Sequence, residues 1–321
     1  MSFQSPVSMQ DILTAQARIR DFVRHTPLER SIELSRQTSG EVYLKMENLQ
    51  LTGSFKPRGS FNRLQTLSES ERLKGVIAPT AGNHGIGLSY AAAQLNIPSH
   101  IFLPENTDPV KIALLKAQGA NIQFFETIED ARQAARRVAQ EENFTFVSAY
   151  NDKAVVAADG TIGLEILSDL PDVEVVVVCV GGGGLASGIG TVMKTVNPKI
   201  EVWGVQAANS PTFARWHEAG QTVAVELQPS IAEGLSGYIE PETITFPIFR
   251  QVVDRVVTVS EHELVDAMKW MLDHHQHVVE PSGAAAVAAL LQNPEQLSGR
   301  KIAATITGRN ISLSRLMALI G

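Results

Sequence analysis

The sequence predicts an α/β protein built from two doubly wound parallel sheets. From Gly75 onward, apolar strand-like runs alternate with amphipathic helical runs, and 24 glycines are spread over many short loops. Parallel strands that are joined by helices form sheets with helices on both faces. A length of 321 residues leaves room for about two domains of ordinary size.

Residues 75–146 carry the first regular alternation and are long enough for a small domain. Short apolar runs bounded by turn residues predict strands, and apolar positions at helical spacing predict helices. In order, we expect a strand at 76–79, a helix at 85–95, a strand at 100–103, a helix at 109–118, a strand at 121–125 and a helix at 128–142.

Residues 1–74 and 147–321 are expected to form a second, larger domain. The expected helices span 11–24, 58–67, 160–169, 185–196, 261–275, 283–291 and 312–320. The expected strands span 41–47, 173–180, 200–206 and 301–305. The segment 221–247 has the least regular pattern, so we expect a surface excursion that packs over one edge.

Charge and cysteine content narrow the function classes. The net charge is −7 without a dense basic run, which argues against nucleic acid or an anionic membrane as partner. Arg132, Arg136 and Arg137 are expected on a solvated helix face. Cys179 is the only cysteine, so an intrachain disulfide is impossible and a reducing cytoplasm is favoured. Residues 1–10 lack signal-peptide features, and no apolar run approaches the ~18 residues of a membrane span.

Lys56 is the reactive candidate, because it is the one lysine in the glycine-rich stretch Thr52–Ser60. An amine with an ordinary pKa of about 10.4 becomes nucleophilic near neutral pH only when it is desolvated or lies beside another positive charge. We expect Phe55 and Arg58 to provide these conditions. The alternative is a solvated lysine at the start of a helix, which is common.

Two loops between a strand and a helix are candidate anion sites. Thr80–Gly85 is expected to direct backbone N–H groups into a crevice at the carboxyl end of a sheet, where a carboxylate or phosphate binds. The alternative is a plain turn with Asn83 as the helix cap and His84 as a core histidine. Gly181–Gly184 have no side chains, so a phosphate can approach their backbone amides and the positive end of the helix dipole. A dinucleotide fingerprint does not fit, because no acidic residue ends the next strand at Gln206, and a Walker A loop is absent.

The C-terminal third holds further polar candidates. Thr307 follows a strand, and its hydroxyl either faces the polar edge of a ligand or caps the next helix. Glu280 opens a helix, where an acid is favourable. His274, His275 and His277 have a spacing that spreads their rings around a helix end, so we expect solvated imidazoles and no metal site.

Five motifs occur along the chain in the order SFKPRGS, TAGNHG, GGGGL, EPSGA and TGRN. Together they resemble the motifs of the tryptophan-synthase-β-like (fold type II) pyridoxal-phosphate enzymes, above all the serine/threonine dehydratase and serine racemase branch. The resemblance covers nearly the whole chain. It implies pyridoxal 5′-phosphate in a cleft between a large cofactor-binding domain and a small substrate-binding domain, and a homodimer or homotetramer as the assembly.

The resemblance also implies roles for individual residues. Lys56 binds the cofactor aldehyde covalently, is displaced by the amine of the substrate, and then, as a free amine, removes the α-proton of the substrate. The other implied cofactor-binding residues are Phe55 beside the ring, Asn83 at its 3-hydroxyl, Gly181, Gly182, Gly183, Gly184 and Leu185 around the phosphate, Glu280, and Thr307 at the pyridine nitrogen. The residues implied at the substrate carboxylate are Thr80, Ala81, Gly82, Asn83 and His84.

The implied reaction is that of a dehydratase (ammonia-lyase), in which a 3-hydroxyamino acid, above all L-threonine or L-serine, becomes a 2-oxo acid and ammonia. Three alternatives stay open: 3-hydroxyaspartate or another hydroxyamino acid as the substrate, serine racemase activity, and a phosphate-ligand binding module without chemistry. Ala81 stands where racemases of this branch carry a serine, so racemisation is expected to be poor.

Two further departures from the family pattern bear on specificity and metals. Arg309 replaces a second glycine, and its side chain is either solvated or phosphate-facing, or it reads a second substrate carboxylate. Gln206, Ser210 and Thr212 stand where metal-activated relatives place their ligands, so a divalent metal is not expected, while a monovalent ion stays open. No regulatory domain follows residue 321, so we expect no feedback control of the biosynthetic threonine deaminase kind.

Overall fold

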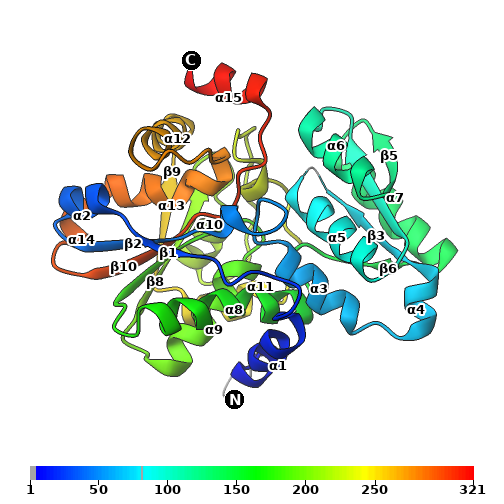
Figure 1. Cartoon of the computed structure of the whole chain (residues 1–321), viewed down its shortest axis with the longest axis horizontal. Helices are drawn as coiled ribbons and strands as arrows, with labels where there is room; N and C mark the ends of the chain where they lie inside the picture. Colours follow the sequence, from blue (N-terminus) through cyan, green and yellow to red (C-terminus); the bar gives the residue numbers. More distant parts are fainter. Residues whose placement is uncertain (1–4, 81) are drawn as a thin grey trace.

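The computed structural model describes residues 5–80 and 82–321 and contains two sheets that lie side by side (Figure 1). The larger sheet has the strand order β1 (Leu28–Arg30), β2 (Glu41–Lys45), β10 (Lys301–Thr305), β7 (Val175–Cys179), β8 (Glu201–Ala207) and β9 (Arg255–Val259). The smaller sheet has the order β5 (Asn121–Phe125), β4 (Ser99–Pro104), β3 (Val76–Pro79) and β6 (Thr145–Phe146). Paired strands are parallel except β1 and β2, which are antiparallel.

Helices cover both faces of the larger sheet because its central strands are apolar on both sides. All five residues of β7 are buried, as expected for a parallel strand between two helical layers. Val176 and Val178 pack into one core with α1 (Met9–Ile19), α3 (Pro57–Gln65), α8 (Lys153–Asp169), α9 (Gly184–Val196), α10 (Thr212–Ala219) and α11 (Thr245–Val252). Val175 and Val177 pack into a second core with α2 (Ile32–Thr38), α12 (Glu261–His275), α13 (Pro281–Gln292), α14 (Pro294–Leu297) and α15 (Leu313–Ile320).

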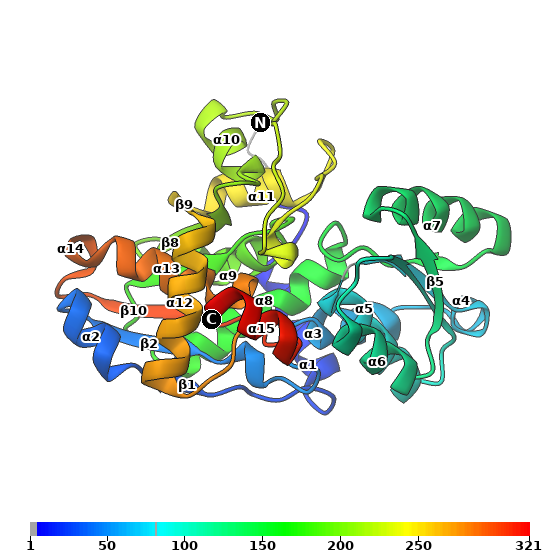
Figure 2. The ribbon, with the colours of Figure 1, turned by 90° about the horizontal axis from the view of Figure 1, so that it is seen from above.

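The smaller sheet is also covered on both faces. The helices around it are α4 (Glu69–Lys74), α5 (Asn83–Gln94), α6 (Pro109–Ala117) and α7 (Ile128–Glu142). Figure 2 shows α7 on one face of this sheet and α5 and α6 on the other. The predicted fold class, two doubly wound parallel sheets, is confirmed. The division of the chain into 75–146 and the remainder stays a prediction.

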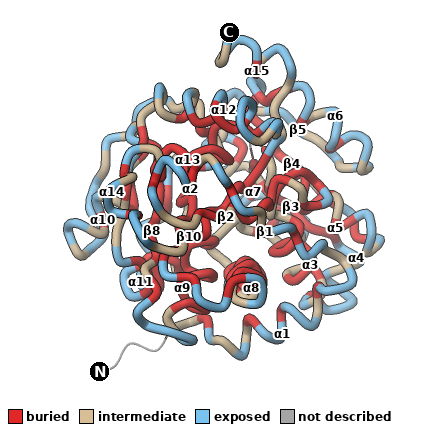
Figure 3. The backbone as a smooth tube through the Cα atoms, turned by 60° about the vertical axis from the view of Figure 1, so that its left-hand side comes forward, coloured by how far each residue is buried: buried red, intermediate tan, exposed pale blue. Residues whose placement is uncertain are grey.

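Buried residues follow the strands and the inner helices, whereas exposed residues gather on outer helices such as α1 and α15 (Figure 3). Two short 3-10 helices, Glu47–Leu49 and Glu233–Leu235, complete the regular elements of the described residues. Within those residues, no helix is both long and apolar enough to cross a bilayer.

Several element predictions were wrong in extent. The helix predicted from residue 160 begins at Lys153, because Asp152 caps it by accepting hydrogen bonds from the amides of Ala154 and Val155. The helix predicted at 11–24 ends at Ile19. The short α-helices and strands that the sequence pattern did not predict are β1, α2, α4, β6, α10, α11, β9 and α14.

Candidate active site

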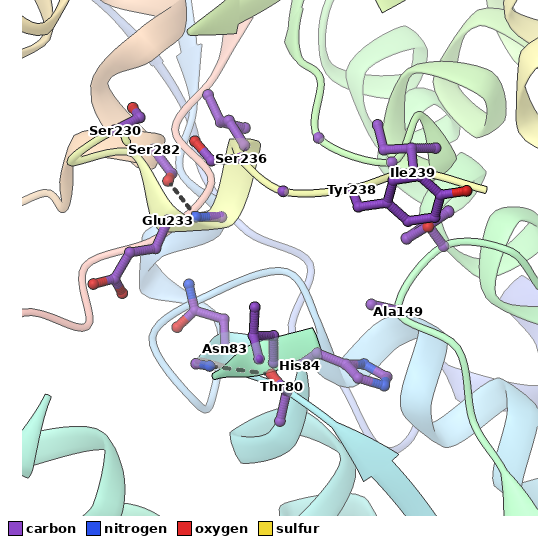
Figure 4. Close-up of a pocket in the computed structure, with 18 of the residues that line it drawn as sticks. Thr80, Asn83, His84, Ala149, Ser230, Glu233, Ser236, Tyr238, Ile239 and Ser282 are labelled. Carbon is purple, nitrogen blue, oxygen red and sulfur yellow. Dashed lines mark hydrogen bonds between the residues drawn. The ribbon is translucent and has the colours of Figure 1, made fainter. Parts of the chain in front are cut away.

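A cavity of about 600 Å³ opens at the carboxyl ends of the parallel strands (Figure 4). Thr80 follows β3, Gly181 follows β7 and Thr307 follows β10, so three loops from separate strands meet there. The sequence-predicted residues that line it are Phe55, Lys56, Thr80, Gly82, Asn83, His84, Gly181, Gly182, Gly183, Gly184, Leu185, Glu280 and Thr307. Ala81, also a predicted site residue, lies outside the described residues.

Lys56 stands immediately before Pro57, the first residue of α3. Its Nζ donates a hydrogen bond to the carbonyl oxygen of Ala149 at 3.1 Å and lies 4.5 Å from the centre of the Phe55 ring. Removal from water lowers the pKa of Lys56, and the negative charge of Asp159 opposes this only in part. Lys56 is thus a half-buried lysine inside the cavity rather than an exposed one, and its reactive role stays a prediction.

Arg58 does not activate Lys56, contrary to the prediction. Its guanidinium is buried and donates to Glu165 at 2.6 Å and to Glu47 at 2.7 Å. Lys45, also buried, pairs with Glu165 at 2.7 Å. These charges form a closed network between α3, α8 and β2, so the positive charge of Arg58 is compensated there.

The glycine loop has no room for side chains. A Cβ on Gly182 would lie 2.2 Å from Cγ of Tyr150, and a Cβ on Gly181 would lie 2.6 Å from the carbonyl oxygen of Gly234. Gly183 has a φ of +81°, which favours glycine. Because α9 begins at Gly184, the loop presents backbone amides at a helix N-terminus, which suits a phosphate.

Asn83 is held by two side-chain partners from the C-terminal half of the chain. Its Nδ2 donates to Glu280, and its Oδ1 accepts a hydrogen bond from Nδ2 of Asn310 at 2.7 Å. Burial raises the pKa of Glu280. Asn83 is the first residue of α5 and makes no capping hydrogen bond, so its alternative role as a helix cap is wrong.

His84 lines the cavity as a neutral ring. Its Nε2 lies 3.0 Å from the carbonyl oxygen of Val147 and therefore carries the proton. Burial, together with the positive charge of Lys56, lowers the pKa of His84 to about 4. Beside it, Oγ1 of Thr80 accepts a hydrogen bond from the amide of Gly82 at 3.1 Å. Figure 4 shows Thr80, Asn83 and His84 on one wall of the cavity.

Thr307 closes the floor of the cavity at the end of β10. Its hydroxyl lies 3.3 Å from the carbonyl oxygen of Ser282, and the cap of α15 is Ser312, so the alternative that Thr307 caps that helix is wrong. Cys179 lies at the same floor, and burial raises the pKa of its thiol to about 11. It is therefore neutral near pH 7.

The segment 227–239 forms the opposite wall (Figure 4). This part of the predicted surface excursion covers the cavity rather than one edge of a sheet. Arg132 was expected to be solvated, but it lines the cavity and donates to the carbonyl of Tyr238 at 3.3 Å. Nζ of Lys111 pairs with Glu233 of the same segment at 2.9 Å. The sequence did not reveal this wall, because irregular backbone has no periodicity that indicates what it covers.

Comparison with known proteins places the chain in a family. A profile described as "Pyridoxal-phosphate dependent enzyme" matches residues 19–308. The chain belongs to this family of pyridoxal-phosphate dependent enzymes. It is 42% identical to "L-threonine ammonia-lyase" of Thermotoga maritima over 98% of this chain and 78% of that protein. It is 36% identical to "L-threonine dehydratase catabolic TdcB" of Escherichia coli, over 100% of this chain and 98% of that protein.

Solved structures of similar sequence have the same fold. Maize serine racemase matches with a TM-score of 0.92 at 30% identity, over 97% of this chain and 96% of that one. The processed form of threonine deaminase isoform 2 from Solanum lycopersicum matches with a TM-score of 0.90 at 28% identity, over 98% of this chain and 94% of that one. The family that the five motifs resemble is thereby confirmed.

Neither Arg309 nor Gln206 is among the described residues that line the cavity. Arg309 is exposed. Oε1 of Gln206 accepts a hydrogen bond from the amide of Ala214 at 2.8 Å. Within residues 5–80 and 82–321, no group of three histidine, cysteine or acidic side chains is arranged to hold a metal ion.

Proposed function

We propose that this protein is an ammonia-lyase that converts L-threonine or L-serine to the corresponding 2-oxo acid and ammonia with pyridoxal 5′-phosphate. The observation that carries the proposal is one cavity that holds both a desolvated lysine, Lys56, and a four-glycine loop at a helix N-terminus. The threonine ammonia-lyase of Thermotoga maritima, which matches 98% of the chain, supports threonine as the substrate.

The residues of the cavity fit the cofactor. The amine of Lys56 is available for a covalent bond to an aldehyde, because burial favours its neutral form. The amides of the loop fit a phosphate, because a side chain at Gly181 or Gly182 would collide with its surroundings. The remaining residues that we assign to the cofactor are Phe55, Asn83, Gly183, Gly184, Leu185, Glu280 and Thr307.

When bound, pyridoxal 5′-phosphate supplies an electron sink that makes the α-proton of an amino acid acidic. Lys56 is the base that takes this proton at Nζ. Thr307, which lines the cavity, would offer the ring nitrogen a hydroxyl rather than a carboxylate, and this would weaken the sink and favour loss of the β-hydroxyl over transamination.

The loop after β3 is assigned to the substrate carboxylate. Thr80, Gly82, Asn83 and His84 line the cavity, and we place Ala81 with them from the sequence. His84 is neutral near pH 7 and donates its one ring N–H to the carbonyl oxygen of Val147, so its side chain offers the carboxylate neither charge nor a hydrogen bond and contributes only the shape of the wall. The segment 227–239 limits the access of water to the reacting atoms.

The wider assignments rest on the same proposal. We assign residues 1–74 and 147–321 to cofactor binding and residues 75–146 to substrate binding. We also propose a cytoplasmic location, which the single cysteine favours, and a homodimer or homotetramer, which the resemblance implies. Serine racemase activity is the second candidate, because maize serine racemase shares the fold at 30% identity. Ala81 has no hydroxyl to exchange a proton, so elimination is expected to exceed racemisation.

A substrate panel tests the proposal. L-Threonine, L-serine and L-threo-3-hydroxyaspartate are incubated with the purified holoenzyme, and 2-oxo acid, ammonia and D-serine are measured, with Lys56→Ala as the control. We expect threonine or serine to give equal amounts of 2-oxo acid and ammonia. Release of neither product from any of the three substrates would contradict the proposal, and D-serine formed as fast as pyruvate would favour a racemase.

The panel also decides the role of Arg309. Because Arg309 is exposed and is not among the described lining residues, its position supports a solvated side chain. Arg309→Gly should then leave the ratio of kcat/KM for 3-hydroxyaspartate and threonine unchanged. A loss of about tenfold or more for 3-hydroxyaspartate alone would show that Arg309 reads a second carboxylate.

A further inference from the structure

Asp159 is a buried acid for which the reaction has no use so far. It lies within α8 with 1% of its surface exposed, and neither carboxylate oxygen has a hydrogen-bond partner among the described residues. Buried carboxylates are normally paired, because an isolated buried charge is costly. The unpartnered state of Asp159 therefore needs an explanation.

The carboxyl group lies behind the glycine loop. Oδ2 of Asp159 is 3.3 Å from the position that a Cβ on Gly184 would occupy. Gly184 begins α9 and lines the cavity, whereas Asp159 is not among the described lining residues. A thin layer of backbone thus separates the acid from the place assigned to the phosphate.

The groups around Asp159 leave its pKa close to neutral pH. Burial raises the pKa of Asp159 to about 7, the positive charges of Lys56 and Arg58 oppose the rise, and the negative charge of Glu47 adds to it. Arg58 is already bonded to Glu47 and Glu165, and Nζ of Lys56 donates to the carbonyl of Ala149. On the side of α9, Oδ2 of Asp159 faces the side-chain-free position of Gly184.

We propose that Asp159 is a positioning residue that takes up a proton when the cofactor phosphate occupies the glycine loop. A phosphate dianion and an ionised carboxylate on either side of one backbone layer repel each other strongly in a medium of low dielectric constant. The proton comes from solvent and binds a carboxylate oxygen, and no other bond forms or breaks. This inference rests on the cofactor placement of the proposed function.

Cofactor affinity should consequently depend on pH through Asp159. Above pH 7, a ligand that requires the protonated acid loses about tenfold in affinity for each pH unit. Pyridoxal, which lacks the phosphate, should not show this dependence. If Asp159 instead only balanced the positive charge of Lys56, the affinities of pyridoxal and pyridoxal 5′-phosphate would depend on pH in the same way. This difference separates the two roles.

Equilibrium titration of the apoprotein tests the inference. The Kd of pyridoxal 5′-phosphate and of pyridoxal is measured between pH 6 and 9 for the wild type, Asp159→Asn and the control Asp21→Asn, whose side chain is 80% exposed. Asp159→Asn keeps the shape and mimics the protonated acid. The ratio of wild-type to Asp159→Asn Kd for the phosphate ligand should rise about tenfold per pH unit above 7, and Asp21→Asn should follow the wild type.

Proton uptake by the wild type gives a second measurement that needs no variant. Calorimetry at pH 8 in buffers of different ionisation enthalpy should show about one more proton taken up with pyridoxal 5′-phosphate than with pyridoxal. Equal uptake, or a ratio of Kd values that is flat with pH, would overturn the inference. If either of these results is found while the cofactor still binds to Lys56, the inference about Asp159 fails and the proposed function stands. If no cofactor binds at all, the proposed function itself is contradicted.

Discussion

Asn310 donates one side-chain hydrogen bond to Oδ1 of Asn83 at 2.7 Å and another to the carbonyl oxygen of Thr52 at 2.8 Å. It thereby fixes which end of the Asn83 amide is the donor, and that donor points to Glu280. The loop after β10 thus orients a cavity residue that belongs to the loop after β3. Asn310 is not among the described residues that line the cavity, so we expect it to act through Asn83.

Asn310→Ala should weaken cofactor binding without unfolding the protein. Loss of one such hydrogen bond costs about 1 kcal/mol, so we expect the Kd of pyridoxal 5′-phosphate to rise about fivefold. Fluorescence titration measures it, with Asn121→Ala at an exposed strand position as the control. An unchanged Kd in Asn310→Ala would mean that Asn83 needs no such support.

Gly182→Ala should damage the phosphate site specifically. The added Cβ collides with the ring of Tyr150, so the loop or the ring must move, and we expect a loss of about tenfold or more in cofactor affinity. Gly119→Ala is the control, because Gly119 has a φ of +73° but no atom within 4 Å of its Cβ position. It should lower stability while keeping the affinity. Equal effects of the two substitutions on cofactor affinity would contradict the assignment of the glycine loop to the phosphate.

Arg58→Met should destabilise the fold strongly because it strands two buried carboxylates, Glu47 and Glu165. Removal of one partner from a buried ion pair costs about 3–5 kcal/mol. Urea unfolding measures the loss, and Arg36→Met, which removes an exposed arginine from Glu33, should change stability little. A loss of similar small size in both variants would show that the buried network contributes nothing.

His84 should make the protein less stable in mild acid. Because its folded-state pKa is lowered from 6.5 to about 4, its contribution is complete above pH 6.5 and is lost as the pH falls toward 4. Between pH 6.5 and 5 the loss is about 2 kcal/mol. Between pH 6.5 and 5, His84→Gln should lose about 2 kcal/mol less unfolding free energy than the wild type. The control His262→Gln, whose original side chain is 86% exposed, should lose as much as the wild type. An equal acid loss in the wild type and His84→Gln would contradict the assignment.

The glycine loop was predictable from residue type, whereas the roles of the individual site residues stay predictions. Only glycine leaves room for the ring of Tyr150 at Gly182. Lys56 is singled out by its motif in combination with the other four motifs. The parallel strands were predictable because β7 is apolar throughout, as a strand between two helical layers must be.

Contacts between distant segments were not predictable from local pattern. Asn310 and Asn83 are 227 residues apart and meet only because β10 and β3 end at the same cavity. Arg58 looked like a neighbour of Lys56 in sequence, but it lies two residues further on, inside a helix, and its side chain points to α8 instead. Asp159 drew no attention in the sequence, because only its burial without a partner makes it unusual.

The most direct test of the central claim is reductive trapping of the cofactor. The purified holoenzyme is treated with borohydride, digested, and searched by mass spectrometry for the peptide that carries the pyridoxyl phosphate. We predict one labelled peptide that contains Lys56, no label at that position in Lys56→Ala, and loss of the visible absorption band on reduction. A label on another lysine, or a protein that stays colourless after addition of pyridoxal 5′-phosphate, would contradict the account.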